Sequence, residues 1–397
     1  MNRRLFLFTG QYPYSKYVEC FLEDEILHLS SYFEEVIIIP TRKDEYLREI
    51  PQNCTVTQDI FQNKISFMLK GLFNKRSFSF LWKDFFENRV YSCRKKFLVW
   101  LKCYYVTNNY LNSKVVKDIE KSICSSDVCY SYWGKWSNVL SLFWSNKCHF
   151  VSRFHGAWDL WEEDFDDYAP LRQQVVNHLE KAYFISKKGA DYFKVKYPHA
   201  NTQICRLGSR DFGNKNRTLG CVVKIVSCST IYPLKRIPLI YKTVCLFAKR
   251  NSEKKVEWTH IGGGPNYSEL ELLTKGHNCI NLHINLVGLC NHDEVIEFYK
   301  KNDYSVFINL STNEGVPVSI MEAISFNIPV IGTDVGGTSE IVTSLTGQLV
   351  SSDPSESEVA EAIEFLQTAG ICPREFWMKY YNASTNYSSF AKELATL

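Results

Sequence analysis

The chain has 397 residues, of which 45% are hydrophobic, so it can bury a large core and form two or three domains. Its formal net charge of +3 is too small to indicate a nucleic-acid partner. The fourteen cysteines match no common zinc-binding spacing and are expected to be free thiols in a reducing compartment. No apolar run reaches about 18 residues, which argues against a membrane-spanning helix.

The first half of the chain alternates short β-branched or aromatic runs with helical patterns, as parallel α/β structure does. The opening MNRRLFLFTG has basic residues before an apolar run, but the run is too short for a signal peptide and is interpreted as a strand. A helix is predicted next, from apolar residues at Val18, Phe21, Leu22, Ile26, Leu29 and Phe33. Further strands are predicted at EEVIIIP, DVCYSYW, CHFVSRFHG and AYFISKKG.

A basic and aromatic segment interrupts this alternation. Residues 60–105 contain ten Lys or Arg against only Asp84 and Glu87, a net charge of +8, with Phe and Trp residues interleaved. Basic helices with an aromatic face can lie in an anionic membrane interface. The alternative is a helical insert, residues 60–122, whose aromatic side chains pack on the first domain while its lysines face water.

From Gly208 to Gly220 glycines and charges replace the apolar pattern, which predicts a linker at 209–220. A second series of strands is predicted after it, at CVVKIVSCST, VEWTHIGGG, NLHINLVG, YSVFINLS and IPVIGTDVGG. The fold class is therefore α/β, with doubly wound Rossmann-like domains at 1–208 and 221–375 facing each other across a ligand cleft. Residues 376–397 are expected to be helical and to return to the first domain.

The segment STNEGVPVSIME carries two glutamates around a turn. Glu314 is expected at the carboxyl end of a buried strand, where α/β folds bind ligands. A helix is expected to begin at about Val316, with Pro317 in its first turn, so that the amides of 315–318 form a phosphate site. Glu322 lies about 9 Å further along. This arrangement fits a nucleotide sugar; a capping glutamate plus a solvated one is the alternative.

The block STNEGVPVSIMEAISFNIPVIGTDVGGTSEIV resembles the donor-binding signature of the GT-B glycosyltransferases of family GT4. CSTIYPLKRIPLI resembles the family's basic diphosphate segment, WTHIGGGP its glycine turn and NLVGLCNHDEVIEFY the segment that frames the base. SRFHGAWDLW resembles the strand end that presents a histidine to the transferred sugar. YSYWGKWSN and QYPYSKYVECFLEDEI are similar to segments of bacterial members that build surface polysaccharides.

The resemblance implies roles for particular residues. The leaving diphosphate would be bound by Lys235, Arg236, Gly315, Val316, Pro317 and Val318. The nucleotide would be framed by Gly262, Gly263, Val287 and Gly288. Glu314 would hold hydroxyls of the donor sugar, Glu322 those of the ribose, and His155 would contact the sugar from the first domain, so that His155 and Glu314 are the catalytic pair. On chemistry alone, a structural histidine is the alternative for His155.

Two departures from the family pattern stand out. Ser229 and Thr230 replace a Gly-Arg pair of many relatives, so one phosphate-binding arginine is missing, and Arg236 is the candidate substitute. The loop after the first strand, GQYPYSKY, is not glycine-rich. The acidic run Asp164–Asp167 has no strand ahead of it to place two metal ligands and is interpreted as a solvated loop. Neither a metal nor a further cofactor is expected.

We therefore expect a cytoplasmic, metal-independent, retaining glycosyltransferase. It would move a hexose or related sugar from a nucleotide-sugar donor to an oligosaccharide or polyprenyl-diphosphate-linked acceptor in bacterial O-antigen, lipopolysaccharide or capsule synthesis. Peripheral contact with the inner membrane through 60–105 stays open. The alternatives are a nucleotide-sugar epimerase, a sugar phosphorylase, and a non-catalytic partner in a polysaccharide assembly complex. The set His155, Lys235, Glu314 and Glu322 favours an enzyme.

Overall fold

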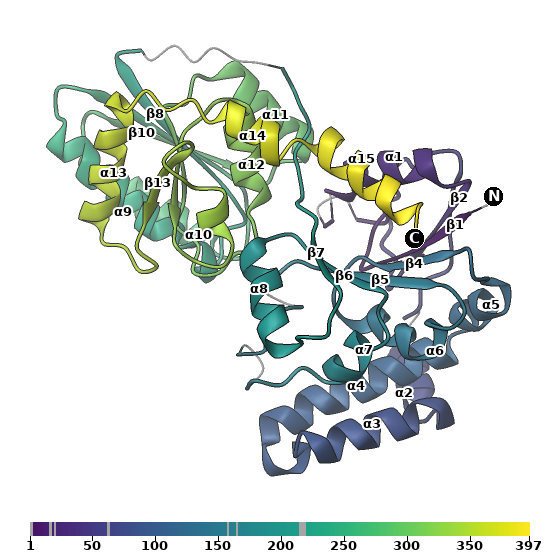
Figure 1. The fold of residues 1–397 in the computed structure, drawn as a ribbon. Helices are drawn as coiled ribbons and strands as arrows, with labels where there is room; N and C mark the ends of the chain where they lie inside the picture. Colours follow the sequence, from purple (N-terminus) through teal and green to yellow (C-terminus); the bar gives the residue numbers. More distant parts are fainter. Residues whose placement is uncertain are drawn as a thin grey trace. The chain divides into compact units, whose positions relative to one another are not determined.

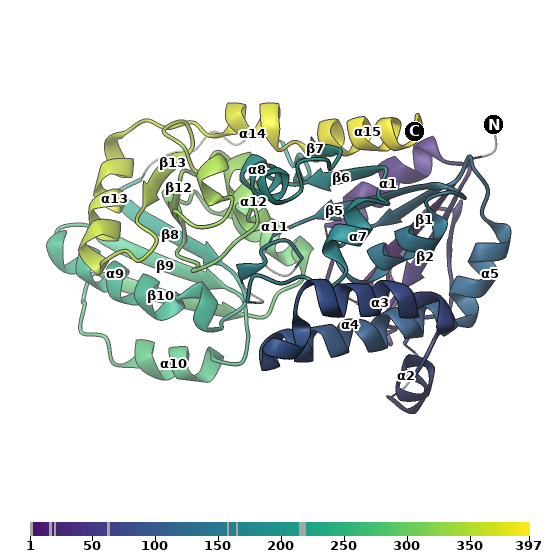
Figure 2. The ribbon, with the colours of Figure 1, turned by 60° about the horizontal axis from the view of Figure 1, so that its bottom comes forward.

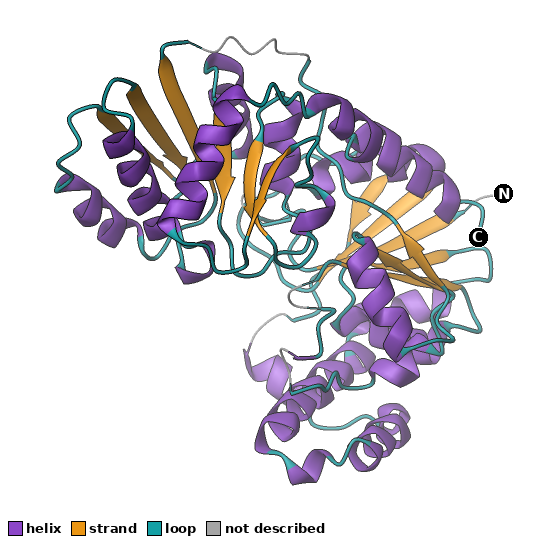
Figure 3. Ribbon diagram, turned by 60° about the vertical axis from the view of Figure 1, so that its left-hand side comes forward, coloured by secondary structure: helices purple, strands orange, loops and turns teal. Residues whose placement is uncertain are grey.

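The computed structural model describes residues 3–15, 18–19, 21–61, 64–156, 159–163, 166–213 and 220–397. The chain divides into two compact units, one of Met1–Cys205 with Tyr387–Leu397 and one of Arg206–Asn386. We call them unit 1 and unit 2. Half of the expected linker, residues 214–219, lies outside the described residues. In each unit a parallel sheet has helices on both faces (Figures 1 and 3), which confirms the predicted fold class.

Unit 1 is built on a seven-stranded sheet in the order β3-β2-β1-β4-β5-β6-β7. The strands are β1 (Arg4–Thr9), β2 (Glu35–Pro40), β3 (Cys54–Val56), β4 (Val128–Ser131), β5 (His149–Phe154), β6 (Lys181–Phe184) and β7 (Thr202–Ile204). Alternate residues of β1 enter different cores, Leu5 and Leu7 on one face and Phe6 and Phe8 on the other. Because both faces are covered, the strand is apolar throughout.

The helices of unit 1 are α1 (Leu22–Tyr32), α2 (Lys64–Gly71), α3 (Lys75–Glu87), α4 (Arg94–Asn112), α5 (Lys114–Ser122), α6 (Ser141–Trp144), α7 (Arg172–Val176), α8 (Lys187–Lys196) and α15 (Ala383–Leu394). Short 3-10 helices are η1 (Val90–Ser92) and η2 (Trp136–Leu140). One face of the sheet packs against α1 and α15, which lie side by side in Figures 1 and 2. The other packs against α4, α5 and α6.

The first helix begins later than predicted. It starts at Leu22, and Val18 lies outside it with an exposed side chain. The cause is Glu19, whose backbone has a φ of 57°. The Glu19 carboxylate accepts N–H groups of Gly10, Gln11 and Tyr12 at 2.7–2.9 Å. This side chain ties the loop after β1 to the start of α1, which postpones the helix.

The basic and aromatic segment forms a helical group of α2, α3 and α4 (Figure 2). Three asparagines of α4 hold the end of α2, since Asn108, Asn109 and Asn112 donate to backbone carbonyls of α2 at 2.8–3.1 Å. Its apolar side chains are buried to different degrees, and membrane contact stays a prediction. Trp100 is buried, whereas other apolar side chains are exposed: Met68, Leu69, Phe73, Phe78, Phe86, Phe97 and Leu98. Among the described residues no helix is long and apolar enough to span a bilayer.

Unit 2 has a six-stranded parallel sheet in the order β10-β9-β8-β11-β12-β13. Its strands are β8 (Val222–Cys228), β9 (Lys255–Ile261), β10 (Leu282–Gly288), β11 (Val306–Asn309), β12 (Val330–Thr333) and β13 (Gly347–Val350). Its helices are η4 (Pro233–Lys235), α9 (Ile237–Arg250), α10 (Tyr267–Lys275), α11 (His292–Lys301), α12 (Val318–Ser325), η5 (Thr338–Glu340), α13 (Glu356–Thr368) and α14 (Arg374–Tyr380). The strand order reverses between β8 and β11, which makes their carboxyl ends a switch point.

Two features of the C-terminal part bear on the predictions. Helix α12 begins at Val318 rather than at about Val316, because Pro317 is extended with ψ of 120° and a residue before proline is disfavoured in helix. Residues 387–397 belong to unit 1, which confirms the expected return for this part, whereas residues 376–386 belong to unit 2 and do not return as predicted. In unit 1 the Phe390 ring packs edge-on against Tyr130 and Tyr183, with ring centroids 5.4 and 4.9 Å apart.

Candidate functional site

The switch point of unit 2 brings together two of the predicted site residues. Lys235 ends η4 in the loop after β8, and Glu314 lies in the loop after β11, the neighbouring strand. The two loops are joined by a backbone hydrogen bond from Thr312 N–H to the Leu234 carbonyl at 2.9 Å. Ligands of open α/β sheets bind at this kind of edge.

Lys235 and Glu314 form an ion pair, in which Lys235 Nζ donates to Glu314 Oε1. Their side chains are only 17% and 13% exposed, so the pair is largely shielded from water. Such pairs are costly to leave half-made, because a lone charge would stay buried. The pair therefore keeps a cation and a carboxylate at the switch point. A ligand that brings an anionic group to Lys235 and hydroxyl groups to Glu314 can bind both side chains.

The glycine turn of the signature shapes the Glu314 loop. Gly336 has φ of 50°, and a Cβ on it would lie 1.7 Å from the Glu314 carbonyl oxygen. Gly337 N–H donates to the Gly315 carbonyl at 2.8 Å. No residue with a side chain fits at 336 without moving the loop. The glycine turn, which follows β12, thus fixes the position of the loop that carries Glu314.

Arg236, next to Lys235, is engaged with backbone carbonyls. Its guanidinium donates to Leu310 at 2.5 Å, to Ser311 at 3.2 Å and to Ser352 at 2.8 Å. It also contacts Asp353 at 3.0 Å. These contacts hold the loops after β11 and β13 together, a structural role that the sequence did not indicate. The expected phosphate contact of Arg236 stays a prediction.

Glu322 lies within α12 and is 7% exposed, which rules out the solvated glutamate of the alternative reading. Its Oε1 accepts a hydrogen bond from His292 Nε2 at 2.8 Å. His292 was not among the residues expected from the sequence. Asn291 and Glu294 form a capping box that starts α11 and fixes His292 at its first position. The capping residues in CNHDEV could have placed His292 at the start of a helix.

The predicted phosphate amides need one correction. Pro317 has no N–H to donate, so it acts only through its fixed backbone conformation. Gly315, Val316 and Val318 do have amides, and α12 presents the positive end of a helix from Val318 onward.

The glycines expected near the nucleotide lie together at the ends of β9 and β10. Gly262 N–H donates to the Gly288 carbonyl at 2.9 Å, and Val287 precedes Gly288 in β10. Gly262 has φ of 143°, and a Cβ there would be 1.9 Å from the Ser229 carbonyl. Ile231 N–H donates to the Gly263 carbonyl at 2.7 Å. The turn is therefore packed against the loop that leads to Lys235.

His155 belongs to unit 1 and follows β5. Its imidazole is 9% exposed and packs against Tyr132 and Trp133, with ring centroids 4.6 and 4.5 Å away. Burial lowers the pKa of His155, so the ring is neutral at neutral pH. His155 N–H and Gly134 N–H donate to the Asp159 carboxylate at 3.0 and 2.9 Å. Asp159, a second overlooked residue, fixes the loop that carries the histidine.

In the described part of the acidic loop of unit 1, Glu162, Glu163 and Asp167 lie around Lys196, at 3.3, 3.6 and 3.9 Å from its Nζ. Asp166 pairs with Lys95 at 3.2 Å, and Asp164 lies outside the described residues. Among the described residues no group of three His, Cys, Asp or Glu side chains is arranged to hold a metal ion.

Unit 2 is similar to one known family. Residues 222–376 match the family model described as glycosyl transferases group 1. Lys235, Glu314 and Glu322 all lie within the matched region.

Similar proteins support the family and the fold. The O-antigen biosynthesis glycosyltransferase WbnH of Escherichia coli is 37% identical over 98 residues, 24% of this chain and 26% of WbnH. The UDP-N-acetylglucosamine–peptide N-acetylglucosaminyltransferase GtfA subunit of Streptococcus agalactiae is 33% identical over 107 residues, 26% of this chain. The matched regions span only 20% and 26% of these two relatives.

Among solved structures, an E. coli trehalose-6-phosphate synthase bound with UDP-2-fluoro glucose is similar over 99% of both chains, with a TM-score of 0.68 and 11% identity. HepE of Anabaena, in complex with UDP and glucose, is similar over 100% of both chains, with a TM-score of 0.63 and 13% identity. At these identities the likeness concerns the fold, and the two units of the chain have the GT-B fold of these structures.

Proposed function

We propose that the protein transfers a sugar from a nucleotide-sugar donor to a saccharide acceptor. The observation that carries the proposal is the Lys235–Glu314 pair at the switch point of unit 2, within the region that matches the group 1 family model. A departing nucleoside diphosphate needs its growing negative charge stabilised, and a cation beside helix amides can do so without a metal. A carboxylate in the same place can accept sugar hydroxyls.

In this proposal the ion pair opens when the donor binds. The diphosphate takes over Lys235, together with the amides of Gly315, Val316 and Val318, and the sugar hydroxyls take over Glu314. Lys235 then has an anionic partner and Glu314 has hydrogen-bond donors, which offsets the cost of separating the pair. Glu322, held by His292, accepts the ribose hydroxyls. The neutral imidazole of His155 can hydrogen-bond the sugar without adding charge.

We further propose transfer with retention of anomeric configuration, independent of metal, to a lipid-linked saccharide of a bacterial surface polysaccharide. The similarity to an O-antigen glycosyltransferase supports the acceptor class. The exposed apolar side chains of α2–α4, beside many basic residues, support contact with the cytoplasmic face of an anionic membrane. Analysis of product configuration and of activity in EDTA checks the first two points, and sedimentation with anionic against neutral vesicles checks the third.

The decisive experiment is a thermal-shift screen against UDP-, GDP-, ADP- and dTDP-sugars, each compared with its free nucleotide. Ligand binding raises the melting temperature by mass action. One nucleotide sugar should stabilise the wild type but neither Glu314→Ala nor Lys235→Ala. Glu271→Ala, which removes an exposed carboxylate on α10, is the matched control and should respond as the wild type does.

The outcomes separate the possible functions. A donor that is consumed only when a saccharide acceptor is present supports transfer. Conversion of the nucleotide sugar without acceptor would indicate an epimerase, and a requirement for inorganic phosphate would indicate a phosphorylase. If no nucleotide sugar shifts the melting temperature of the folded protein, the proposal fails and a non-catalytic role takes its place.

A further inference from the structure

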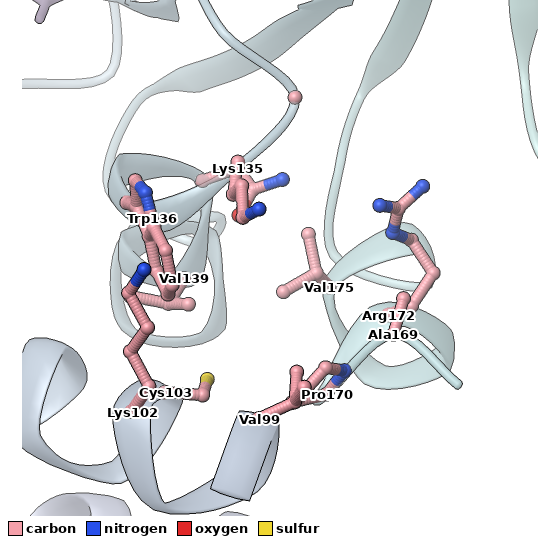
Figure 4. Close-up of a pocket in the computed structure, with 12 residues that line it drawn as sticks. Val99, Lys102, Cys103, Lys135, Trp136, Val139, Ala169, Pro170, Arg172 and Val175 are labelled. Atoms are coloured by element: carbon pink, nitrogen blue, oxygen red, sulfur yellow. The ribbon is translucent and has the colours of Figure 1, made fainter. Parts of the chain in front are cut away.

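Unit 1 contains a cavity that none of the predicted site residues lines. It has a volume of about 150 Å³ and lies between α4, the segment of η2 and the segment of α7 (Figure 4). A cavity of this size holds a group of roughly benzene dimensions. The side chain of Lys102 remains exposed to solvent, so the cavity is reached from the surface.

Three cationic side chains line the cavity. Lys102 and Lys135 place their ammonium groups 5.2 and 4.9 Å from the centre of the Trp136 ring. Figure 4 shows Arg172 on the opposite side, with Val175 between. None of the described lining residues is acidic. The cavity therefore gathers positive charge without a carboxylate among its walls.

Arg172 has an unused donor in this arrangement. The residue is 9% exposed, and its Nη2 donates to the Asp159 carbonyl at 2.7 Å. Nη1 is buried and has no hydrogen-bond partner among the described residues. The guanidinium also packs over the rings of Phe154 and Phe193, with its carbon 5.1 and 5.8 Å from their centres. Burial and the charge of Lys102 lower the pKa of Lys135 to about 8, although the carboxylate of Asp159 acts in the opposite direction.

The surroundings indicate what carries the anion. Leu98 precedes Lys102 by four residues, so both lie on the same side of α4. Leu98 is 53% exposed and Phe97 40%. An apolar surface thus continues from the cationic cavity along one helix. A ligand that matches both has a highly charged head and an apolar chain.

We propose that this cavity binds a phosphate group of the acceptor, carried on a lipid diphosphate. The inference rests on the proposed transferase function and adds a place for the acceptor. Two lysines and an arginine suit a phosphate oxyanion, which carries more charge than a carboxylate and accepts several hydrogen bonds at once. The apolar chain would lie along the exposed face of α4.

Calorimetric titration with inorganic pyrophosphate tests the cavity. The protein carries Lys235→Ala, so that the donor site does not contribute. Added Lys102→Met or Lys135→Met should weaken binding at least tenfold. Lys83→Met removes an equal charge from exposed α3, outside the cavity, and should change affinity less than twofold. No pyrophosphate binding, or equal weakening by all three variants, would overturn the site.

The source of the phosphate is tested with two more probes. Farnesyl diphosphate should bind at least tenfold more tightly than pyrophosphate, and Leu98→Ser should reduce only that gain. Equal affinity for both would mean that the site takes a free or sugar-linked phosphate, which overturns the lipid carrier. Glucuronate that binds as tightly as pyrophosphate would overturn the phosphate assignment.

The inference and the proposed function fail in different ways. Lys102→Met should leave the thermal shift by the nucleotide sugar unchanged, because Lys102 lines the cavity and is not among the residues assigned to the donor. Transfer to a lipid-linked acceptor with no effect of Lys102→Met on the acceptor KM would remove the cavity and leave the transferase. Pyrophosphate binding without any nucleotide-sugar binding would remove the transferase and leave a phosphate site.

Discussion

Replacing Gly336 by alanine should cripple the donor site through its backbone alone. The new Cβ would lie 1.7 Å from the Glu314 carbonyl oxygen, whereas real Cβ contacts are essentially never under 3.0 Å, so the loops must separate by at least 1.3 Å. A displacement of about 1 Å at a catalytic group costs roughly 100-fold in rate. The left-handed φ adds about 1–2 kcal/mol of backbone strain. We expect transfer to fall at least about 100-fold.

Gly370→Ala is the matched control, because Gly370 has a φ of 61° and no atom within 4 Å of its ideal Cβ. It carries the same kind of backbone strain without a collision. The assay measures transfer and donor affinity per folded molecule, with folding followed by circular dichroism. If Gly336→Ala keeps transfer and donor affinity within twofold of Gly370→Ala, the Glu314 loop is not positioned by the glycine turn.

Three further predictions follow from single contacts. Burial raises the pKa of Asp84 to about 6, so its contribution to stability is full below pH 4 and is lost as pH rises through 6; Asp84→Asn should abolish this loss of up to about 3 kcal/mol, measured by denaturant unfolding between pH 4 and 7. Arg236→Lys should lower the free energy of unfolding by about 2–4 kcal/mol, because lysine cannot reach three carbonyls together; an unchanged melting temperature would contradict this. His292→Ala should weaken donor binding about tenfold, less than Glu322→Ala does, when both variants are titrated with the nucleotide sugar in a calorimeter.

The central strands could be predicted from sequence because they are buried on both faces and apolar along their length. The three strands that were not predicted, β3, β7 and β13, are the short ones at sheet edges. Ile204 of β7, for instance, is 37% exposed. An edge strand is hydrogen-bonded to only one neighbouring strand, and its other edge is open. Its residues therefore need not be apolar, and its sequence shows little hydrophobic pattern.

The site was predictable in its residue types but not in its pairing. The motif placed Lys235 and Glu314 each in a loop, 79 residues apart in sequence. Only the reversal of strand order brings those loops together. Arg236 was expected to bind phosphate because its segment resembles the family's diphosphate segment, and that contact stays a prediction. Its hydrogen bonds to backbone carbonyls were not indicated by the sequence. Contacts of this kind depend on the tertiary fold, which local pattern does not contain.

Because α15 packs on unit 1, unit 1 can complete its folding only after the whole chain has been synthesised. Phe390 covers Arg153, with its ring centre 4.2 Å from the guanidinium carbon, and Arg153 is paired with Glu25 at 2.6 Å in the core. A ribosome makes Phe390 only after all of unit 2. During synthesis, the face of the first sheet that packs against α1 and α15 is therefore covered by α1 but not by α15 until unit 2 has been made. A chain truncated before Phe390 leaves part of that apolar face exposed, which favours binding by chaperones and cleavage by proteases.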